Sequence, residues 1–232
     1  MMTGRQIKGE RGGKSTATSG TSRADSSEVY SPPRVNGLAK QLGVIPGMSL
    51  DLTVEDPDDG KPWDFNNPEK RDKAERMIRD KRGLLLIGSP MCSAFSQLQS
   101  LNRTRIGEEK YQDMVKKGTE HLEFCAKLYK MQMENGLYFI HEHPAGAKSW
   151  DNELIRRLTE KTGVYTVIGD MCRYGMKQED ELGTGLVKKR TMFMTNAEMI
   201  AGRLAKRCNG GHRHIELING RAKMADISGG SL

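Results

Sequence analysis

The spacing of hydrophobic and polar positions changes repeatedly along the chain from residue 28 onward. Short apolar runs bounded by turn-forming residues predict strands at 28–30, 48–53, 84–87, 137–140, 164–168 and 192–194. Apolar residues three and four positions apart predict helices at 34–42, from Pro68 onward, at 107–135, after a cap at Asp151 or Asn152, and after a cap at Asn196. Strands that alternate with helices predict an α/β fold with a doubly wound, mostly parallel sheet.

Local sequence indicates how some of these elements are placed. Asn67 followed by Pro68 is typical of a helix start, because asparagine can cap the first turn and proline suits its first position. Leu84–Ile87 is an unbroken apolar run, which is typical of a central strand buried on both faces. Cys125 lies on the apolar face of the 107–135 helix, so we expect it in the core.

The first 27 residues differ in amino-acid composition from the rest of the chain. Fourteen of them are Gly, Ser or Thr, and five are Lys or Arg. Such a segment buries too little apolar surface to offset the entropy lost on ordering it. We therefore predict a flexible basic tail at 1–27, one domain at 28–222 and a short C-terminal tail at 223–232. The basic tail acts either as a solubilising leader or as a loose contact for phosphate groups.

Composition argues against a membrane-spanning or secreted protein and favours a polyanionic partner. The 232 residues are enough for one domain, and they include no apolar run of the ~20 residues that a membrane span needs. The N-terminus has no apolar core of a signal peptide, and the four cysteines form no CxxC pair. We therefore expect no membrane partner and an intracellular, reducing compartment, either cytoplasm or nucleus. The net charge of +7 favours a polyanion such as nucleic acid as partner.

Chemically useful side chains follow the predicted strands. Cys92 lies in the loop after 84–87, Glu142 follows 137–140, and the basic cluster Lys188–Arg190 precedes 192–194. Ligands of open α/β sheets bind beyond the carboxyl ends of the strands, so these groups should meet at one edge. A cysteine there can act as a nucleophile when a positive neighbour lowers its pKa, and a glutamate can bind or protonate a substrate.

In this order the segments resemble the catalytic domain of cytosine-C5 DNA methyltransferases, over about residues 28–206. Pro90–Ser96 looks like the family's nucleophile loop, in which Phe-Ser follows Pro-Cys. Glu142–Pro144 stands where the family has Glu-Asn-Val, and Lys188–Thr191 is similar to its Arg-rich element. The resemblance implies the fold type of S-adenosylmethionine-dependent methyltransferases and the transfer of a methyl group from that donor to cytosine in DNA.

The resemblance also implies a role for each site residue. Cys92 would attack C6 of a cytosine flipped out of the duplex, and Glu142 would hold its N3/N4 edge. Lys189 and Arg190 would steady the flipped nucleotide. The residues that would bind the donor are Tyr30 and Ser31 in the first loop, Asp51 after the second strand, Asp64 near the adenine, and Pro90.

The chain departs from the family's pattern at several positions. Ser31–Arg34 stands in place of a Gly-rich loop, Met91 separates Pro90 from Cys92, and few residues remain after Arg190 for a target-recognition region. A protein partner would then supply target recognition. The alternative is a catalytically inactive nucleic-acid-binding module of the same fold.

Two histidine-containing segments raise the question of zinc. His141–Pro144, with Ser149 and Asp151, is similar to the HxHP pattern of zinc isopeptidases, which makes a zinc-dependent hydrolase a further alternative. Cys208, His212 and His214 have residue types that bind zinc, and Cys172 could supply a fourth ligand in space. A polar glycine turn explains this segment as simply, so the sequence assigns no metal ligand.

Overall fold

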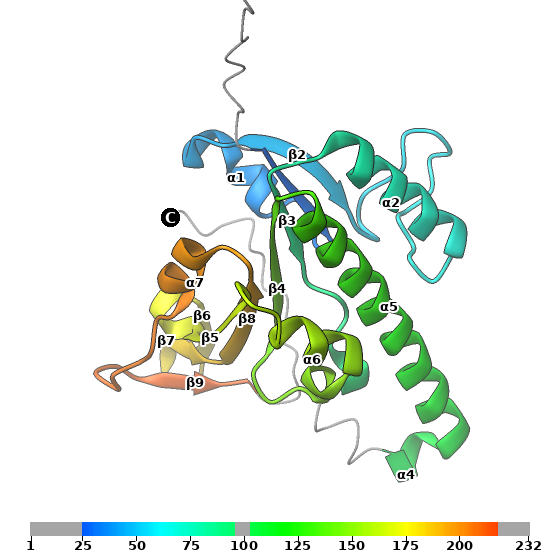
Figure 1. Cartoon of the computed structure of the whole chain (residues 1–232). Helices are drawn as coiled ribbons and strands as arrows, with labels where there is room; N and C mark the ends of the chain where they lie inside the picture. The colour runs from blue at the N-terminus through cyan, green and yellow to red at the C-terminus, as the bar shows by residue number, and fades with distance from the viewer. Residues whose placement is uncertain (1–24, 96–102, 218–232) are drawn as a thin grey trace, which may run out of the picture.

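The computed structural model describes residues 25–95 and 103–217, which form a mixed α/β fold around a six-stranded sheet (Figure 1). The strand order is β2-β1-β3-β4-β8-β5. The strands are β1 (Asp25–Val29), β2 (Ile45–Leu50), β3 (Leu85–Gly88), β4 (Tyr138–Pro144), β5 (Tyr165–Asp170) and β8 (Arg190–Thr195). Neighbours from β2 to β4 are parallel, whereas β8 runs antiparallel to both β4 and β5. The predicted α/β class and the mostly parallel sheet are confirmed.

Helices cover both faces of this sheet, with α2, α5 and α6 on one side and α1 and α7 on the other (Figure 1). The helices are α1 (Val35–Leu42), α2 (Pro68–Lys81), α4 (Arg103–Ile106), α5 (Glu108–Glu134), α6 (Glu153–Thr159) and α7 (Glu198–Leu204). Short 3-10 turns are η1 (Ser93–Phe95), η2 (Lys148–Asp151) and η3 (Met171–Tyr174). None of the helices in the described ranges combines the length and apolar character that crossing a membrane requires.

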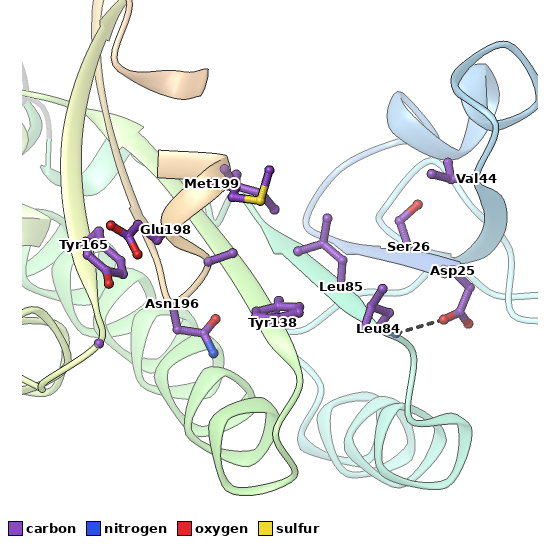
Figure 2. A pocket seen from close by; sticks show the side chains of 13 residues that line it. Asp25, Ser26, Val44, Leu84, Leu85, Tyr138, Tyr165, Asn196, Glu198 and Met199 are labelled. Atoms are coloured by element: carbon purple, nitrogen blue, oxygen red, sulfur yellow. Dashed lines mark hydrogen bonds between the residues drawn. The ribbon is translucent and has the colours of Figure 1, made fainter. Parts of the chain in front are cut away.

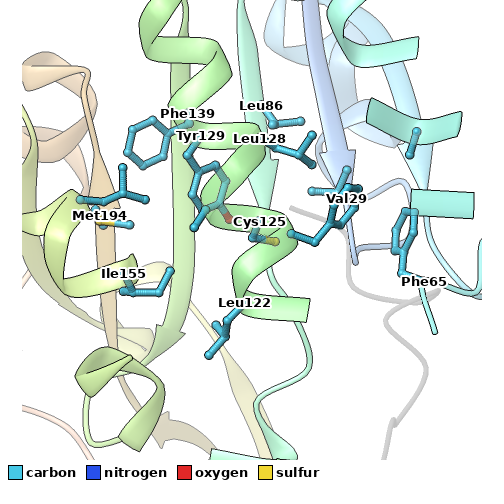
Figure 3. Close-up of a cluster of buried hydrophobic side chains, with 14 of the residues drawn as sticks. Val29, Phe65, Leu86, Leu122, Cys125, Leu128, Tyr129, Phe139, Ile155 and Met194 are labelled. Carbon is cyan, nitrogen blue, oxygen red and sulfur yellow. The ribbon is translucent and has the colours of Figure 1, made fainter. Parts of the chain in front are cut away.

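The main core lies between α5 and the centre of the sheet (Figure 3). Cys125 and Tyr129, one turn apart on α5, are fully buried, so the prediction for Cys125 is confirmed. The Tyr129 ring stacks on Phe139 of β4 at a centroid distance of 4.7 Å. A Cβ at Gly88 would lie 2.0 Å from the Tyr129 hydroxyl oxygen, so only glycine fits at the end of β3. This packing fixes the strand end from which the Cys92 loop begins.

The first strand begins earlier than the sequence predicts. β1 starts at Asp25, so residues 25–27 belong to the sheet and not to the tail. Ser26 and Ser27 are 3% exposed because their hydroxyl groups have partners inside the fold: Ser26 Oγ donates to Asn36 Oδ1 at 2.9 Å, and Ser27 Oγ accepts from the Met48 amide at 3.2 Å. The rest of the predicted N-terminal tail and the predicted C-terminal tail lie outside the described residues.

The structure contains a second sheet that the hydrophobic pattern does not predict. It has the order β6-β7-β9, with β6 (Lys177–Asp180), β7 (Gly183–Lys188) and β9 (His214–Glu216). β6 carries four polar residues and is largely exposed, so it has no apolar alternation to signal a strand.

Two local predictions have opposite outcomes. Asn67 caps α2, its side chain accepting from the Glu69 amide at 2.9 Å, as predicted. Asn196 does not cap α7, because its side chain instead bridges to the backbone at Phe139 and Leu137. The tertiary partners of Asn196 thus replace the local bond that its sequence context favours.

Candidate functional site

The carboxyl ends of the first three parallel strands place the predicted donor-binding residues along one edge. Val29 is in register with Leu50 on β2 and with Gly88 on β3. Beyond this row, the Tyr30 amide donates to the Leu50 carbonyl at 3.0 Å and the Ser89 amide donates to the Val29 carbonyl at 3.2 Å. The segments that hold Tyr30–Ser31, Asp51 and Pro90 therefore begin side by side.

Tyr30 forms a sharp turn at the end of β1. Its backbone has φ = +58°, a left-handed conformation that is uncommon for residues other than glycine. Its side chain turns into the core, where the hydroxyl lies 2.9 Å from His121 Nδ1 and the ring packs on Phe65 at 4.8 Å. Burial raises the pKa of Tyr30. The residue therefore provides a strained backbone turn and not a free hydroxyl group.

A buried carboxylate organises this loop, and the sequence reading missed it. Glu28 on β1 is 1% exposed and accepts from the backbone amides of Val35 at 3.1 Å and Asn36 at 2.9 Å. The Ser31 hydroxyl also donates to it at 3.3 Å. Glu28 thus occupies the N-terminal end of α1, where free amides would otherwise attract an anion. The pattern that could have revealed it is a glutamate inside a buried strand directly before a helix.

The two predicted donor-binding aspartates lie in turns after β2. Asp51 Oδ1 accepts from the amide of Thr53 at 3.0 Å and from its hydroxyl at 2.8 Å. Asp64 Oδ1 accepts from the amide of Asn66 at 2.9 Å and from its side chain at 2.8 Å. The Asp64 charge also raises the pKa of the buried Tyr30 hydroxyl slightly. Both aspartates are thus hydrogen-bonded within their own turns and are partly accessible.

The Cys92 loop is anchored to β4 through His143. His143 Nε2 lies 2.7 Å from the Pro90 carbonyl oxygen, and His143 Nδ1 lies 2.6 Å from Ser149 Oγ. A carbonyl oxygen only accepts, so Nε2 carries the proton and Nδ1 accepts from the serine hydroxyl. Burial lowers the pKa of His143, which is consistent with this neutral form. The sequence places His143 where the family has Asn and within the zinc-isopeptidase-like segment, but it does not predict this anchoring role.

Cys92 itself is half-buried in a loop that is anchored on both sides. Its direct neighbours Met91 and Ser93 are exposed, whereas Pro90 before them and Ala94 and Phe95 after them are buried. The Phe95 amide donates to the Cys92 carbonyl at 3.0 Å, which closes the loop. Ser96, the last residue of the predicted nucleophile loop, lies outside the described residues. The loop is therefore held on both sides of the thiol.

The structure brings Cys92, Glu142 and Lys189 together. Lys189 Nζ lies 4.0 Å from Glu142 Oε1, and both side chains are about one-third exposed, at 34% and 29%. Burial raises the pKa of the Cys92 thiol, the Lys189 charge lowers it, and the Glu142 charge raises it, with a raised pKa as the result. The thiol is therefore protonated at neutral pH, and a thiolate has to be generated when the site is used.

Two of the predicted catalytic residues, Glu142 and Arg190, are placed differently from the sequence-based expectation. Glu142 lies inside β4 and not after a strand, because β4 continues to Pro144 in its pairing with β8. Arg190 is exposed at the start of β8, where its charge acts on Asp170 at the end of β5. Three of the four predicted catalytic residues thus form one group, and no contact in the described structure joins Arg190 to it.

The opposing charges around the thiol predict a change in its reactivity. Lys189→Met should raise the pKa of Cys92 further and slow its alkylation near neutral pH by about 2- to 5-fold, because a smaller fraction is thiolate. Glu142→Gln should have the opposite effect. The measurement is the rate of Cys92 carbamidomethylation against pH, followed by mass spectrometry of its peptide. Lys188→Met removes the same charge one residue away and serves as the control. Identical profiles for wild type and Lys189→Met would contradict this electrostatic coupling.

A second group of side chains converges just after the carboxyl end of β5. The ligand atoms of Cys172, Cys208, His212 and His214 all lie within 4.8 Å of one another. In residues 25–95 and 103–217, no other three or more His, Cys, Asp or Glu side chains gather closely enough to hold a metal. The zinc-isopeptidase-like segment therefore does not form such a group, and the ring nitrogens of His143 are both engaged.

A cavity of about 580 Å³, shown in Figure 2, lies at the edge of the sheet where the parallel strands begin. It is lined by residues that begin β3 and β4, such as Leu85 and Tyr138, and by Met199 of α7. Because its walls belong to the N-terminal ends of the parallel strands, it is separate from the group around Cys92.

Two comparisons with known proteins assign this chain to no family. A scan against protein-family models finds no match, and a search of curated proteins finds none. The functional proposal therefore depends on the residues and their geometry.

Proposed function

We propose that this protein is a cytosine-C5 methyltransferase that acts on DNA with S-adenosylmethionine as the methyl donor. The observation that carries the proposal is the meeting of Cys92, Glu142 and Lys189 at the carboxyl edge of the sheet. This is the edge where α/β sheets bind ligands, and the three residues hold the positions that the family resemblance assigns to catalysis. A mostly parallel sheet with helices on both faces, and a single reversed strand β8, is compatible with the fold type that the resemblance implies.

The loop after β1 supports a donor without phosphate groups. A dinucleotide places its pyrophosphate at the helix N-terminus, but Glu28 already fills that position with a negative charge. S-adenosylmethionine carries positive sulfonium and ammonium groups, for which nearby carboxylates are favourable. Asp51 follows β2 next to this loop and Asp64 lies in a later turn, and both can accept hydrogen bonds from a ribose hydroxyl or an adenine amino group.

The chain's own residues then have defined tasks. A base takes the proton of Cys92, and the sulfur bonds to C6 of the cytosine while the electron pair of the C5–C6 double bond moves onto C5, which becomes electron-rich. Glu142 hydrogen-bonds the N3/N4 edge, so negative charge does not accumulate on the ring. S-adenosylmethionine, when bound, supplies the methyl group that C5 receives. Removal of the C5 proton by a base then releases Cys92. The charge of Lys189 stabilises the Cys92 thiolate, and His143 fixes the loop that carries Cys92.

One observation favours the alternative of an inactive nucleic-acid-binding module. Burial raises the pKa of Cys92 despite the neighbouring Lys189, so the resting thiol is a weak nucleophile. In this alternative the fold and the basic charge remain while donor binding is lost.

Titration of the full-length protein with S-adenosylmethionine tests the proposal. We expect measurable binding by wild type, and Asp64→Ala should weaken it by about 1–3 kcal/mol if Asp64 holds the adenine amino group. Asp72→Ala, which removes an exposed carboxylate from α2, is the matched control and should bind like wild type. Absence of binding by wild type at millimolar donor would overturn the methyltransferase proposal and favour the inactive module.

A further inference from the structure

Two cysteines and two histidines from separate segments meet beside the small sheet. Cys172 is buried on η3, directly after β5, whereas Cys208, His212 and His214 lie on the segment that leads into β9. Cys208 Sγ lies 3.6 Å from His212 Nε2 and 3.3 Å from His214 Nε2, and all four ligand atoms lie within 4.8 Å of one another.

These separations match a tetrahedral zinc site. With Zn–S bonds of about 2.3 Å and Zn–N bonds of about 2.0–2.1 Å, a tetrahedron separates a sulfur from a nitrogen by about 3.6 Å. We propose that the protein binds one zinc ion through Cys172, Cys208, His212 and His214. Four protein ligands close the coordination sphere, which is typical of a structural site and not of a catalytic one.

The surroundings of the cluster orient its ligands. The Gly210 amide lies 3.3 Å from Cys208 Sγ, so a backbone N–H donates to the sulfur that the metal would hold as a thiolate. Gly210 has φ = +82°, and this left-handed turn leads the chain back so that His212 and His214 face Cys208. Asp170 Oδ2 accepts from the Cys208 amide at 2.7 Å and from Arg207 Nε at 3.0 Å, which fixes the cysteine backbone.

A zinc ion here would join the two sheets. β9 has only three residues and pairs with β7, so it has few contacts of its own to hold it in place. Cys172 ties this strand to the end of β5 in the main sheet. The Met171 amide, next to Cys172, donates to the Lys189 carbonyl at 2.8 Å. The metal would thus hold in place the segment that presents Lys189 to Cys92.

Metal analysis of tag-free, full-length protein tests this inference. We expect one zinc ion per chain after dialysis, and loss of the bound zinc in Cys208→Ser and in His214→Asn. Cys92→Ala removes a cysteine outside the cluster and should keep its zinc. Removal of zinc by a chelator should lower the melting temperature by about 10 °C, because metal binding stabilises the folded state.

Cobalt substitution of the wild-type protein keeps the test independent of whether the variants fold. We expect the visible absorption bands of tetrahedral Co²⁺ together with thiolate-to-cobalt charge transfer. Wild-type protein that holds no zinc and gives only the spectrum of octahedral cobalt would overturn the inference. Neither measurement involves S-adenosylmethionine or DNA, so the outcome is separate from the fate of the methyltransferase proposal.

Discussion

Cys92→Ala should abolish the covalent complex that wild-type protein forms with DNA containing 5-fluorocytosine, and should reduce methyl transfer by at least about 10³-fold. The sulfur is the atom that bonds to C6, and alanine has no nucleophile to replace it. Fluorine at C5 cannot leave as a proton does, so the elimination that frees the enzyme stops and the complex persists. A complex that survives denaturing electrophoresis is the readout, with S-adenosylmethionine present.

The substitution should leave the fold intact. The loop is held by the bond between His143 and the Pro90 carbonyl and by the buried side chain of Phe95, and neither depends on the thiol. Ser93→Ala, next to Cys92 and exposed, is the matched control and should form the complex normally. If wild-type protein never forms the complex although it binds donor and DNA, Cys92 is not the nucleophile.

Asp56→Asn should lower the free energy of unfolding by about 2 kcal/mol, because it leaves a buried ammonium group without its main counter-charge. Asp56 is 1% exposed, and its carboxylate accepts from Lys70 Nζ at 2.5 Å and from Lys73 Nζ at 2.6 Å. Both lysines also lie over the Trp63 ring, at 5.0 and 5.4 Å from its centroid. This network holds the loop after β2 against the start of α2.

Urea denaturation measures this loss as a lower midpoint with an unchanged slope. Asp58→Asn is the control, since Asp58 also pairs with Lys73 but is 75% exposed and should contribute no more than about 0.5 kcal/mol. Equal midpoints for wild type and Asp56→Asn would show that the buried network contributes nothing to stability.

The same network predicts part of the acid sensitivity of the protein. Burial alone would raise the pKa of Asp56, but hydrogen bonds from Lys70 and Lys73 outweigh it and lower the pKa to about 2. Because the folded pKa lies below the ordinary aspartate value of 3.8, the stabilisation is present above pH 4 and is lost as the pH falls from about 4 to 2. Asp56→Asn should lack this part of the pH dependence, and an unchanged slope in that range would refute the assignment.

Predictions from the sequence succeeded where a signal and its cause are both local. Asn67 caps α2 by accepting from the Glu69 amide two residues on, whereas the same residue type at Asn196 bonds to the backbone of β4 and its preceding turn. The apolar runs indicated the six strands of the main sheet. The strand β6 consists of polar residues, so it has no apolar run that could have predicted it. The start of β1 was missed for a similar reason, since Ser26 and Ser27 are buried only because partners from α1 and β2 reach them.

The candidate site was predictable only in outline. The rule that ligands bind beyond the carboxyl ends of parallel strands placed Cys92, Glu142 and the cluster Lys188–Arg190 at one edge. In the structure Lys189 Nζ lies 4.0 Å from Glu142 Oε1, whereas Arg190 lies apart. His143 and Glu28, which hold the two loops of that edge, were not found. Both are buried polar residues whose role depends on a partner elsewhere in the fold, Pro90 for His143 and the start of α1 for Glu28.

The sequence by itself determined the alternation of strands and helices, the main core on α5 and the residue types available for chemistry. These follow from spacing along the chain, because burial of one face requires apolar residues at the period of the element. Only the tertiary structure decided that β8 runs antiparallel between β4 and β5, and that Cys172 meets Cys208, His212 and His214. Such meetings depend on the path of the backbone between distant segments, and neither residue spacing nor local conformational preference specifies that path.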